Sequence, residues 1–224
     1  MARPYPFNHL VAVRHLRASD DRMQALIARV GRFQLPLERH AHPFESLLNA
    51  IVYQQLHASA AIAILGRIQQ QLGGGRFPSP AQVLAADDAT LREIGLSRQK
   101  MAALRDLAAK AHSGVVPGWE QVEALPDDAL VARLTQVRGV GVWTVHMLLI
   151  FRLGRPDVLP SLDYGVQQGY QLAYRKRRLP KPKELEAAGE KWRPYRSVAA
   201  WYLWQAVHLH RQSAPKPARR TRAA

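Results

Sequence analysis

Apolar side chains recur every three or four positions along most of the chain, a spacing that places them on one face of an α-helix. In residues 43–56, for example, Phe44, Leu47, Leu48 and Ile51 fall on one such face. Several stretches begin at Asp or Ser and stop at Gly, as capped helices do. The pattern predicts helices over residues 20–31, 43–56, 58–75, 79–86, 87–95, 97–114, 126–137, 142–153, 163–174, 181–192 and 195–212. Only residues 11–16 weakly resemble a strand, so we predict an all-α fold.

The charge balance indicates a polyanionic partner. The 224 residues include 32 Lys and Arg against 17 Asp and Glu, a net charge of +15. A basic protein of this kind suits a polyanionic ligand. No stretch of the sequence is long and apolar enough to span a membrane, so we favour nucleic acid as that ligand. The basic stretch 213–224 has nothing to bury, so we expect a disordered tail that either binds DNA non-specifically or is simply solvated.

The absence of cysteine narrows the chemistry. It excludes disulfides, cysteine-ligated zinc and iron–sulfur clusters, and it fits a reducing compartment. His208 and His210 are two positions apart and do not share a helix face, so they make a poor metal site. We therefore expect no metal site built from side chains.

The segment Arg138–Gly141 joins two predicted helices and is the first candidate site. Its two glycines permit positive φ and leave no Cβ to block close approach. The helix that follows presents unpaired N–H groups at its start, where a phosphate can bind. On the glycines alone, an ordinary helical hairpin with a glycine cap is the simpler interpretation. The net charge makes the phosphate interpretation competitive with it.

Residues 134–170, "LTQVRGVGVWTVHMLLIFRLGRPDVLPSLDYGVQQGY", resemble the helix-hairpin-helix signature of base-excision DNA glycosylases. In that superfamily a Gly-x-Gly hairpin is followed by a Pro-containing loop and a single aspartate. Residues 43–56, 94–108 and 192–204 resemble further blocks of the same superfamily, in the same order. The most similar branch resembles 3-methyladenine DNA glycosylase II in a compact form.

The resemblance implies both a fold and an activity. The fold is a single catalytic unit over residues 1–212, made of two helical lobes with the lesion cleft between them and the hairpin motif at about 134–152. The activity is hydrolysis of the N-glycosidic bond of alkylated bases, such as 3-methyladenine and 7-methylguanine, in double-stranded DNA. The damaged base is flipped out of the duplex, and an abasic site remains. We expect a cytoplasmic monomer that needs no cofactor, associated with the nucleoid if the source is bacterial.

Asp163 is the catalytic candidate that the resemblance implies. Cleavage of the glycosidic bond builds positive charge on the sugar, and an ionised carboxylate beside the sugar stabilises that charge. Asp163 also stands where it can cap the helix predicted over 163–174. The two roles are compatible, because a helix N-terminus favours the ionised carboxylate.

Trp143 occupies the position at which relatives that also nick the DNA strand carry a lysine. An indole cannot form a Schiff base, so we predict a monofunctional hydrolase. An aromatic face also suits a base made cationic by alkylation. The residues expected in the base pocket are Trp143, Tyr164, Trp204, Tyr53 and Met147, whereas Trp192 and Trp201 are expected in the core. Met147 stands where the branch often has tyrosine, which leaves the base preference open.

The resemblance also implies which residues contact DNA. The stretch "YQQLHASAA" corresponds to a turn that fills the gap left by the flipped nucleotide, so the candidates for the wedge are Gln55, Leu56 and His57, with Gln54 structural. The candidates for the DNA backbone contact are Arg138, Gly139, Val140, Gly141 and Thr144. Family hairpins often hold a sodium or potassium ion through backbone carbonyls, here those of Gly139 and Gly141. Arg196 is expected to be structural or to bind phosphate.

Two other functions stay open on the sequence. One is a non-catalytic helix-hairpin-helix module that binds DNA phosphates, although such a module needs neither Asp163 nor the aromatic cluster. The other is a glycosylase for mismatched or oxidised bases. The missing hairpin lysine and the missing iron–sulfur cluster argue against several branches of that kind.

Overall fold

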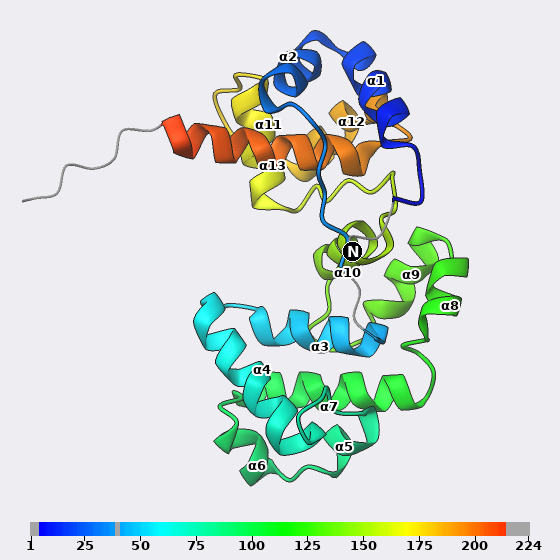
Figure 1. The fold of residues 1–224 in the computed structure, drawn as a ribbon, viewed down its shortest axis with the longest axis vertical. Helices are drawn as coiled ribbons and strands as arrows, with labels where there is room; N and C mark the ends of the chain where they lie inside the picture. The colour runs from blue at the N-terminus through cyan, green and yellow to red at the C-terminus, as the bar shows by residue number, and fades with distance from the viewer. Residues whose placement is uncertain (1–4, 39–40, 214–224) are drawn as a thin grey trace, which may run out of the picture. The chain divides into compact units, whose positions relative to one another are not determined.

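The computed structural model describes residues 5–38 and 41–213, and within these ranges every regular element is a helix (Figure 1). The all-α prediction is therefore confirmed. The predicted basic tail lies outside the described residues, apart from Ser213 at the end of the last helix. Among the described helices, none combines the length and the apolar character that crossing a bilayer requires.

Residues 11–16, whose sequence weakly resembles a strand, lie in helix α1, His9–Ser19. The Asn8 side chain caps the helix by accepting hydrogen bonds from the Leu10 and Val11 amides. Only Ala12 and Leu16 are buried, four positions apart as on one helix face, while Leu10 and Val11 are exposed. The helical period was not recognisable in the sequence, because the exposed apolar residues Leu10 and Val11 lie beside the buried pair.

The chain forms two compact units, and the first comprises residues 37–154. Its long helices are α3 (Pro43–Tyr53), α4 (Ala58–Gly73) and α7 (Arg98–His112), and α7 packs against α3 and against α5 (Pro80–Ala85). The remaining elements are α6 (Asp88–Glu93), α8 (Trp119–Ala124), α9 (Asp127–Leu134), α10 (Val142–Leu148) and a π-helical turn, η1 (Leu149–Leu153). The periodicity did not predict α8, which is short and lacks a side-chain cap.

The second unit comprises the described parts of residues 4–36 and 155–224. Besides α1 it contains α2 (Asp21–Val30), α11 (Tyr164–Ala173), α12 (Pro182–Gly189), the 3₁₀ turn η2 (Glu190–Trp192) and α13 (Arg196–Ser213). Helix α13 packs along α11 and also contacts α1 and α2 (Figure 1). Gly169 lets α11 approach α13 closely, because a Cβ at this position would overlap the Leu203 carbonyl.

Candidate functional site

The hairpin between α9 and α10 has one left-handed residue. Gly139 has a φ of 80°, and a Cβ placed there would lie 3.4 Å from the Cβ of Ala103. Gly141 is extended, with φ −99° and ψ 173°, and is the N-cap of α10. Only Gly139 therefore uses the positive φ that the sequence suggested for both glycines. Gly141 instead leaves the start of α10 open, because a Cβ on it would meet no described atom within 4 Å.

Two side chains of the same unit hold the hairpin. Gln54 Nε2 donates to the carbonyl oxygen of Gly139 at 2.8 Å. Asp106 accepts from the Arg138 amide at 2.6 Å and pairs with Lys110 at 2.6 Å. Burial alone would raise the pKa of the Asp106 carboxyl, but the Arg138 amide and the Lys110 ammonium outweigh it and hold that pKa below its usual range. Asp106 was not among the predicted site residues, although it lies within the block 94–108 that resembles the superfamily.

The structure changes the set of residues expected to contact the DNA backbone. Val140 is buried, and its amide donates to the Val137 carbonyl at 3.0 Å, so this amide is already occupied. Thr144 is only 5% exposed, which argues against a phosphate contact from its hydroxyl. Arg138, Gly139 and Gly141 are exposed. The DNA contacts of Val140 and Thr144 stay predictions, and these observations favour Arg138, Gly139 and Gly141 over them.

At the expected cation site of the hairpin, the Gln54 side chain already binds one of the proposed ligand oxygens. The carbonyl oxygen of Gly139 accepts from the Gln54 amide, so one of its lone pairs is already used within the protein. The structural role expected for Gln54 is confirmed by this bond. A sodium or potassium ion at the Gly139 carbonyl would have to share or displace it.

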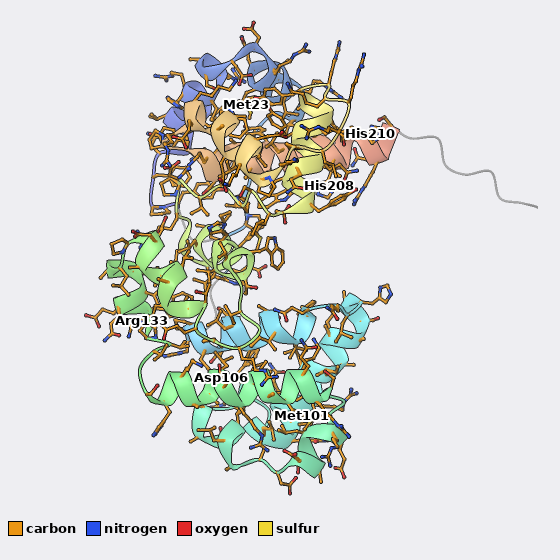
Figure 2. The ribbon with its side chains drawn as sticks, turned by 180° about the vertical axis from the view of Figure 1, so that it is seen from behind. Met23, Met101, Asp106, Arg133, His208 and His210 are labelled. Carbon is orange, nitrogen blue, oxygen red and sulfur yellow. The ribbon has the colours of Figure 1, made fainter. Side chains whose placement is uncertain are left out.

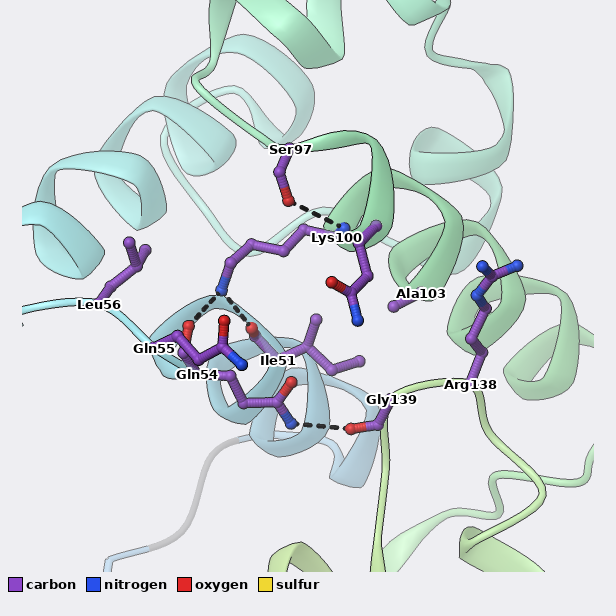
Figure 3. A pocket seen from close by; sticks show the side chains of 10 residues that line it. Ile51, Gln54, Gln55, Leu56, Ser97, Lys100, Ala103, Arg138 and Gly139 are labelled. Atoms are coloured by element: carbon purple, nitrogen blue, oxygen red, sulfur yellow. Dashed lines mark hydrogen bonds between the residues drawn. The ribbon is translucent and has the colours of Figure 1, made fainter.

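The turn between α3 and α4 carries the wedge candidates. Gln55 has a φ of 58°, a left-handed conformation that is uncommon for a residue with a side chain. Gln55 and His57 are exposed, and Leu56 is half-buried. Gln55 and Leu56 line a pocket of about 270 Å³ together with Arg138 and Gly139 of the hairpin (Figure 3). The fold therefore brings together two candidate sites that are about 80 residues apart in the sequence.

Two of the base-pocket candidates share a second pocket in the first unit. Tyr53 and Met147 line a hollow of about 200 Å³, together with the buried Thr144. Thr144 therefore faces this pocket. Trp143 is 42% exposed at the start of α10 and is not among the residues that line it. The pocket joins one face of α3 to one face of α10.

Asp163 lies in the second unit, as the N-cap of α11. Its Oδ1 accepts from the Val166 amide at 2.8 Å and from the indole Nε1 of Trp204 at 2.8 Å. The capping role and the bond to Trp204 orient one carboxylate oxygen from two sides. Gly165 makes room for this arrangement, because a Cβ there would come within 2.9 Å of the Trp204 ring and 3.1 Å of Asp163 Oδ1. Sequence reasoning did not identify Gly165 or the bond to Trp204.

The loop before Asp163 is anchored by the start of α13. Arg196 Nε donates to Asp157 at 2.7 Å, and a second nitrogen of its guanidinium donates to the Asp157 carbonyl at 2.8 Å. The Ser197 hydroxyl accepts from the Val158 amide at 2.9 Å, and the Ser197 amide donates to the Pro156 carbonyl at 2.9 Å. Arg196 therefore has the structural role that was one of its two expected roles. It fixes the loop that delivers Asp163.

The tryptophans and tyrosines of the second unit divide into exposed and buried groups. Tyr164 is 62% exposed beside Asp163, and Trp204 is half-buried. Trp192 and Trp201 are buried, as expected, and Trp201 packs edge-on against Phe33 at a ring distance of 5.0 Å. Tyr164 and Trp204 are therefore at least partly exposed, whereas Trp192 and Trp201 build the core.

The two histidines of α13 lie near its C-terminal end (Figure 2). Both His208 and His210 are exposed. Within residues 5–38 and 41–213, no three histidine or acidic side chains group closely enough to hold a metal ion.

Comparisons with known proteins identify the family and agree with the helical fold. A family model described as "HhH-GPD superfamily base excision DNA repair protein" matches residues 48–194. DNA-3-methyladenine glycosylase 1 of Schizosaccharomyces pombe is 36% identical over 203 residues, which cover 90% of this chain and 89% of that protein. The structure of the S. pombe 3-methyladenine DNA glycosylase in complex with abasic DNA is similar, with a TM-score of 0.77 over 87% of this chain and 95% of that one. A DNA-3-methyladenine glycosidase from Bacillus halodurans is 34% identical, with a TM-score of 0.82 over 95% of this chain and 94% of that one.

Proposed function

Because the chain belongs to the HhH-GPD superfamily of base excision DNA repair proteins, we propose that it is a monofunctional DNA glycosylase for alkylated bases. It hydrolyses the N-glycosidic bond of bases such as 3-methyladenine and 7-methylguanine and leaves an abasic site. The observation that carries the proposal is the half-buried Asp163 carboxylate, held by the Val166 amide and the Trp204 indole.

Asp163 stabilises the charge that develops on the sugar. As the base departs, the sugar becomes oxocarbenium-like, and a carboxylate fixed in advance interacts with that charge without reorganising. The Val166 and Trp204 hydrogen bonds hold Oδ1, so the orientation of the carboxylate is set before the substrate arrives. The same group can orient the water that attacks the sugar.

The remaining site candidates are assigned to binding. The exposed amides at the start of α10 and the exposed Arg138 contact the DNA backbone, and Gln55, Leu56 and His57 fill the gap left by the flipped base. Trp143, Tyr164 and Trp204 offer π-faces to a cationic base, each contact contributing about 0.5–2 kcal/mol. Tyr53 and Met147 supply the apolar pocket of the first unit. We propose that the protein acts as a monomer on damaged double-stranded DNA in the cytoplasm, associated with the nucleoid if the source is bacterial.

A Trp204→Phe variant is expected to lower the single-turnover rate constant of excision about tenfold while leaving DNA affinity close to that of the wild type. Phenylalanine keeps an aromatic ring but loses the N–H that donates to Asp163, and a hydrogen bond to a charged group contributes about 1.5–3 kcal/mol. The measurement is single-turnover excision alongside equilibrium DNA binding. An unchanged rate constant would show that the indole N–H does not orient the carboxylate.

Borohydride added during turnover is expected to trap no covalent complex between the protein and DNA. Trp143 stands where lyase-type relatives carry the lysine that forms a Schiff base, and an indole cannot do so. The reaction product should be an abasic site in an intact strand, which breaks only after alkali treatment. A trapped adduct in good yield would contradict the monofunctional assignment.

A panel of duplexes, each with one defined lesion, tests the substrate class. The expected substrates are bases alkylated at N3 or N7 of a purine, because their positive charge makes them good leaving groups and suits aromatic faces. Duplexes with a mismatched or oxidised base serve as comparisons. Excision confined to those comparison duplexes would overturn the alkylated-base assignment while keeping a glycosylase.

A further inference from the structure

One face of α7 contacts both the α3–α4 turn and the hairpin. Lys100, Ala103 and Asp106 are spaced three residues apart and therefore share a face of the helix. Lys100 binds the end of α3, Ala103 lies where a Cβ on Gly139 would touch it, and Asp106 accepts from the Arg138 amide. Figure 3 shows Lys100 and Ala103 beside the two loops.

The contacts of Lys100 are unusually complete for a lysine. Its Nζ donates to the carbonyl oxygens of Ile51 at 2.8 Å, Val52 at 2.6 Å and Gln54 at 2.8 Å. The last carbonyls of a helix have no partner within the helix, and a cation is favourable there. All three donors of the ammonium are thus used at the end of α3. Lys100 is half-buried, and this burial lowers the pKa of its amine.

The bonds of Lys100 end at Gln54, directly before the left-handed residue of the α3–α4 turn. Gln54, the last residue that Lys100 holds, also donates to the Gly139 carbonyl, and the next residue, Gln55, is left-handed. The backbone on one side of Gln55 is therefore fixed to both α7 and the hairpin. A loose turn would first have to be ordered when it enters DNA, and ordering a chain segment opposes binding.

We infer that Lys100 is a positioning residue for base flipping, because it holds the end of α3 so that Gln55 and Leu56 keep the conformation that enters the DNA. The inference rests on the proposed glycosylase function and on the wedge role of this turn. Lys100 touches neither the sugar nor the base in this account. Its contribution acts through the turn and, by way of Gln54, through the hairpin.

Lys100→Met tests the inference, because methionine keeps the unbranched chain and removes the three donors. Arg67→Met is the matched control. Arg67 also donates to a carbonyl at a helix end, that of Ile94 at 2.6 Å, but it does not line the pocket of Figure 3. The first readout is the fluorescence of 2-aminopurine placed beside a stable abasic analogue in a duplex. Wild type and Arg67→Met should raise this signal on binding, and Lys100→Met should lose most of the rise at saturating protein.

The second readout is single-turnover excision in two contexts. Lys100→Met should slow excision from a fully paired lesion duplex about ten- to a hundredfold, as expected for a misplaced group. The loss should shrink to about threefold when the lesion is mismatched or single-stranded, because flipping is then easier. An equal loss in both contexts, or no greater loss of fluorescence than in Arg67→Met, would overturn the inference.

Lys100→Arg keeps the test decisive if Lys100→Met does not fold. Arginine retains the cation, but its planar fork does not match three converging carbonyls, so an intermediate loss of fluorescence is expected at near wild-type thermal stability. A wild-type signal from Lys100→Arg would overturn the inference. The fluorescence readout needs no catalysis, whereas wild-type excision in the lesion duplexes of the second readout tests the proposed function, so the two failures are distinguishable.

Discussion

An Asp163→Asn variant is expected to release alkylated bases about 10²–10³-fold more slowly than the wild type, the loss typical of removing a group that stabilises developing charge. Asparagine is nearly isosteric, accepts at the same positions from the Val166 amide and the Trp204 indole, and caps helices as well as aspartate does. The variant should therefore fold and bind DNA. What it loses is the negative charge beside the sugar. The measurement is single-turnover release of 7-methylguanine.

Asp87→Asn is the matched control for this prediction. Asp87 is the exposed N-cap of α6, where it accepts from the Thr90 amide at 2.7 Å. The substitution is the same, and the helix-capping role is the same, but no catalytic role is assigned to the position. Full activity is expected. Wild-type release rates in Asp163→Asn would remove Asp163 from the catalytic site, and equal losses in both variants would attribute the effect to capping.

A Gly169→Ala variant is expected to lose about 3 kcal/mol of unfolding free energy, at the upper end of the usual range for overpacking a core. The added methyl group would overlap the Leu203 carbonyl, which belongs to the backbone of α13 and cannot turn aside as a side chain can. The two helices would have to separate, and α11 carries Asp163 at its N-terminus. The measurement is urea unfolding followed by circular dichroism.

Gly66→Ala is the comparison variant, and it is expected to change the unfolding free energy in the opposite direction. Gly66 lies inside α4, and a Cβ there would meet no described atom within 4 Å. Alanine in an open helical position is expected to stabilise by about 0.5–1 kcal/mol, because it forms helix more readily than glycine. Stabilisation by both substitutions would mean that α11 and α13 are not in close contact.

The elements that position the site follow from local patterns in the sequence. Helices α3, α7 and α11 have a clear apolar period, and α7 and α11 also have caps, Ser97 and Asp163 respectively. The apolar period did not predict helix α1, because exposed Leu10 lies near the two buried residues of the helix, Ala12 and Leu16. Helix α8 was not predicted either, because it has only six residues and no capping side chain, which is too short for an apolar period to be recognised.

The bonds that complete the site could not be predicted locally. Gln54 meets Gly139 across 85 positions, Lys100 meets Ile51 across 49, and Trp204 meets Asp163 across 41. Each is set by how helices pack, which spacing along the chain does not encode. The motif around Asp163 indicated the carboxylate, but its hydrogen-bond donors and the space left by Gly165 came only from the fold.

The most direct test of the central claim counts products from methylated duplex DNA. Protein in excess over lesions is incubated with DNA treated with a methylating agent, free bases are identified by mass spectrometry, and abasic sites are counted in the same sample. We expect free 3-methyladenine and 7-methylguanine in numbers that match the abasic sites, with no strand breaks before alkali treatment. Salt-sensitive binding to the same DNA without release of any base would contradict it and identify a DNA-binding module instead.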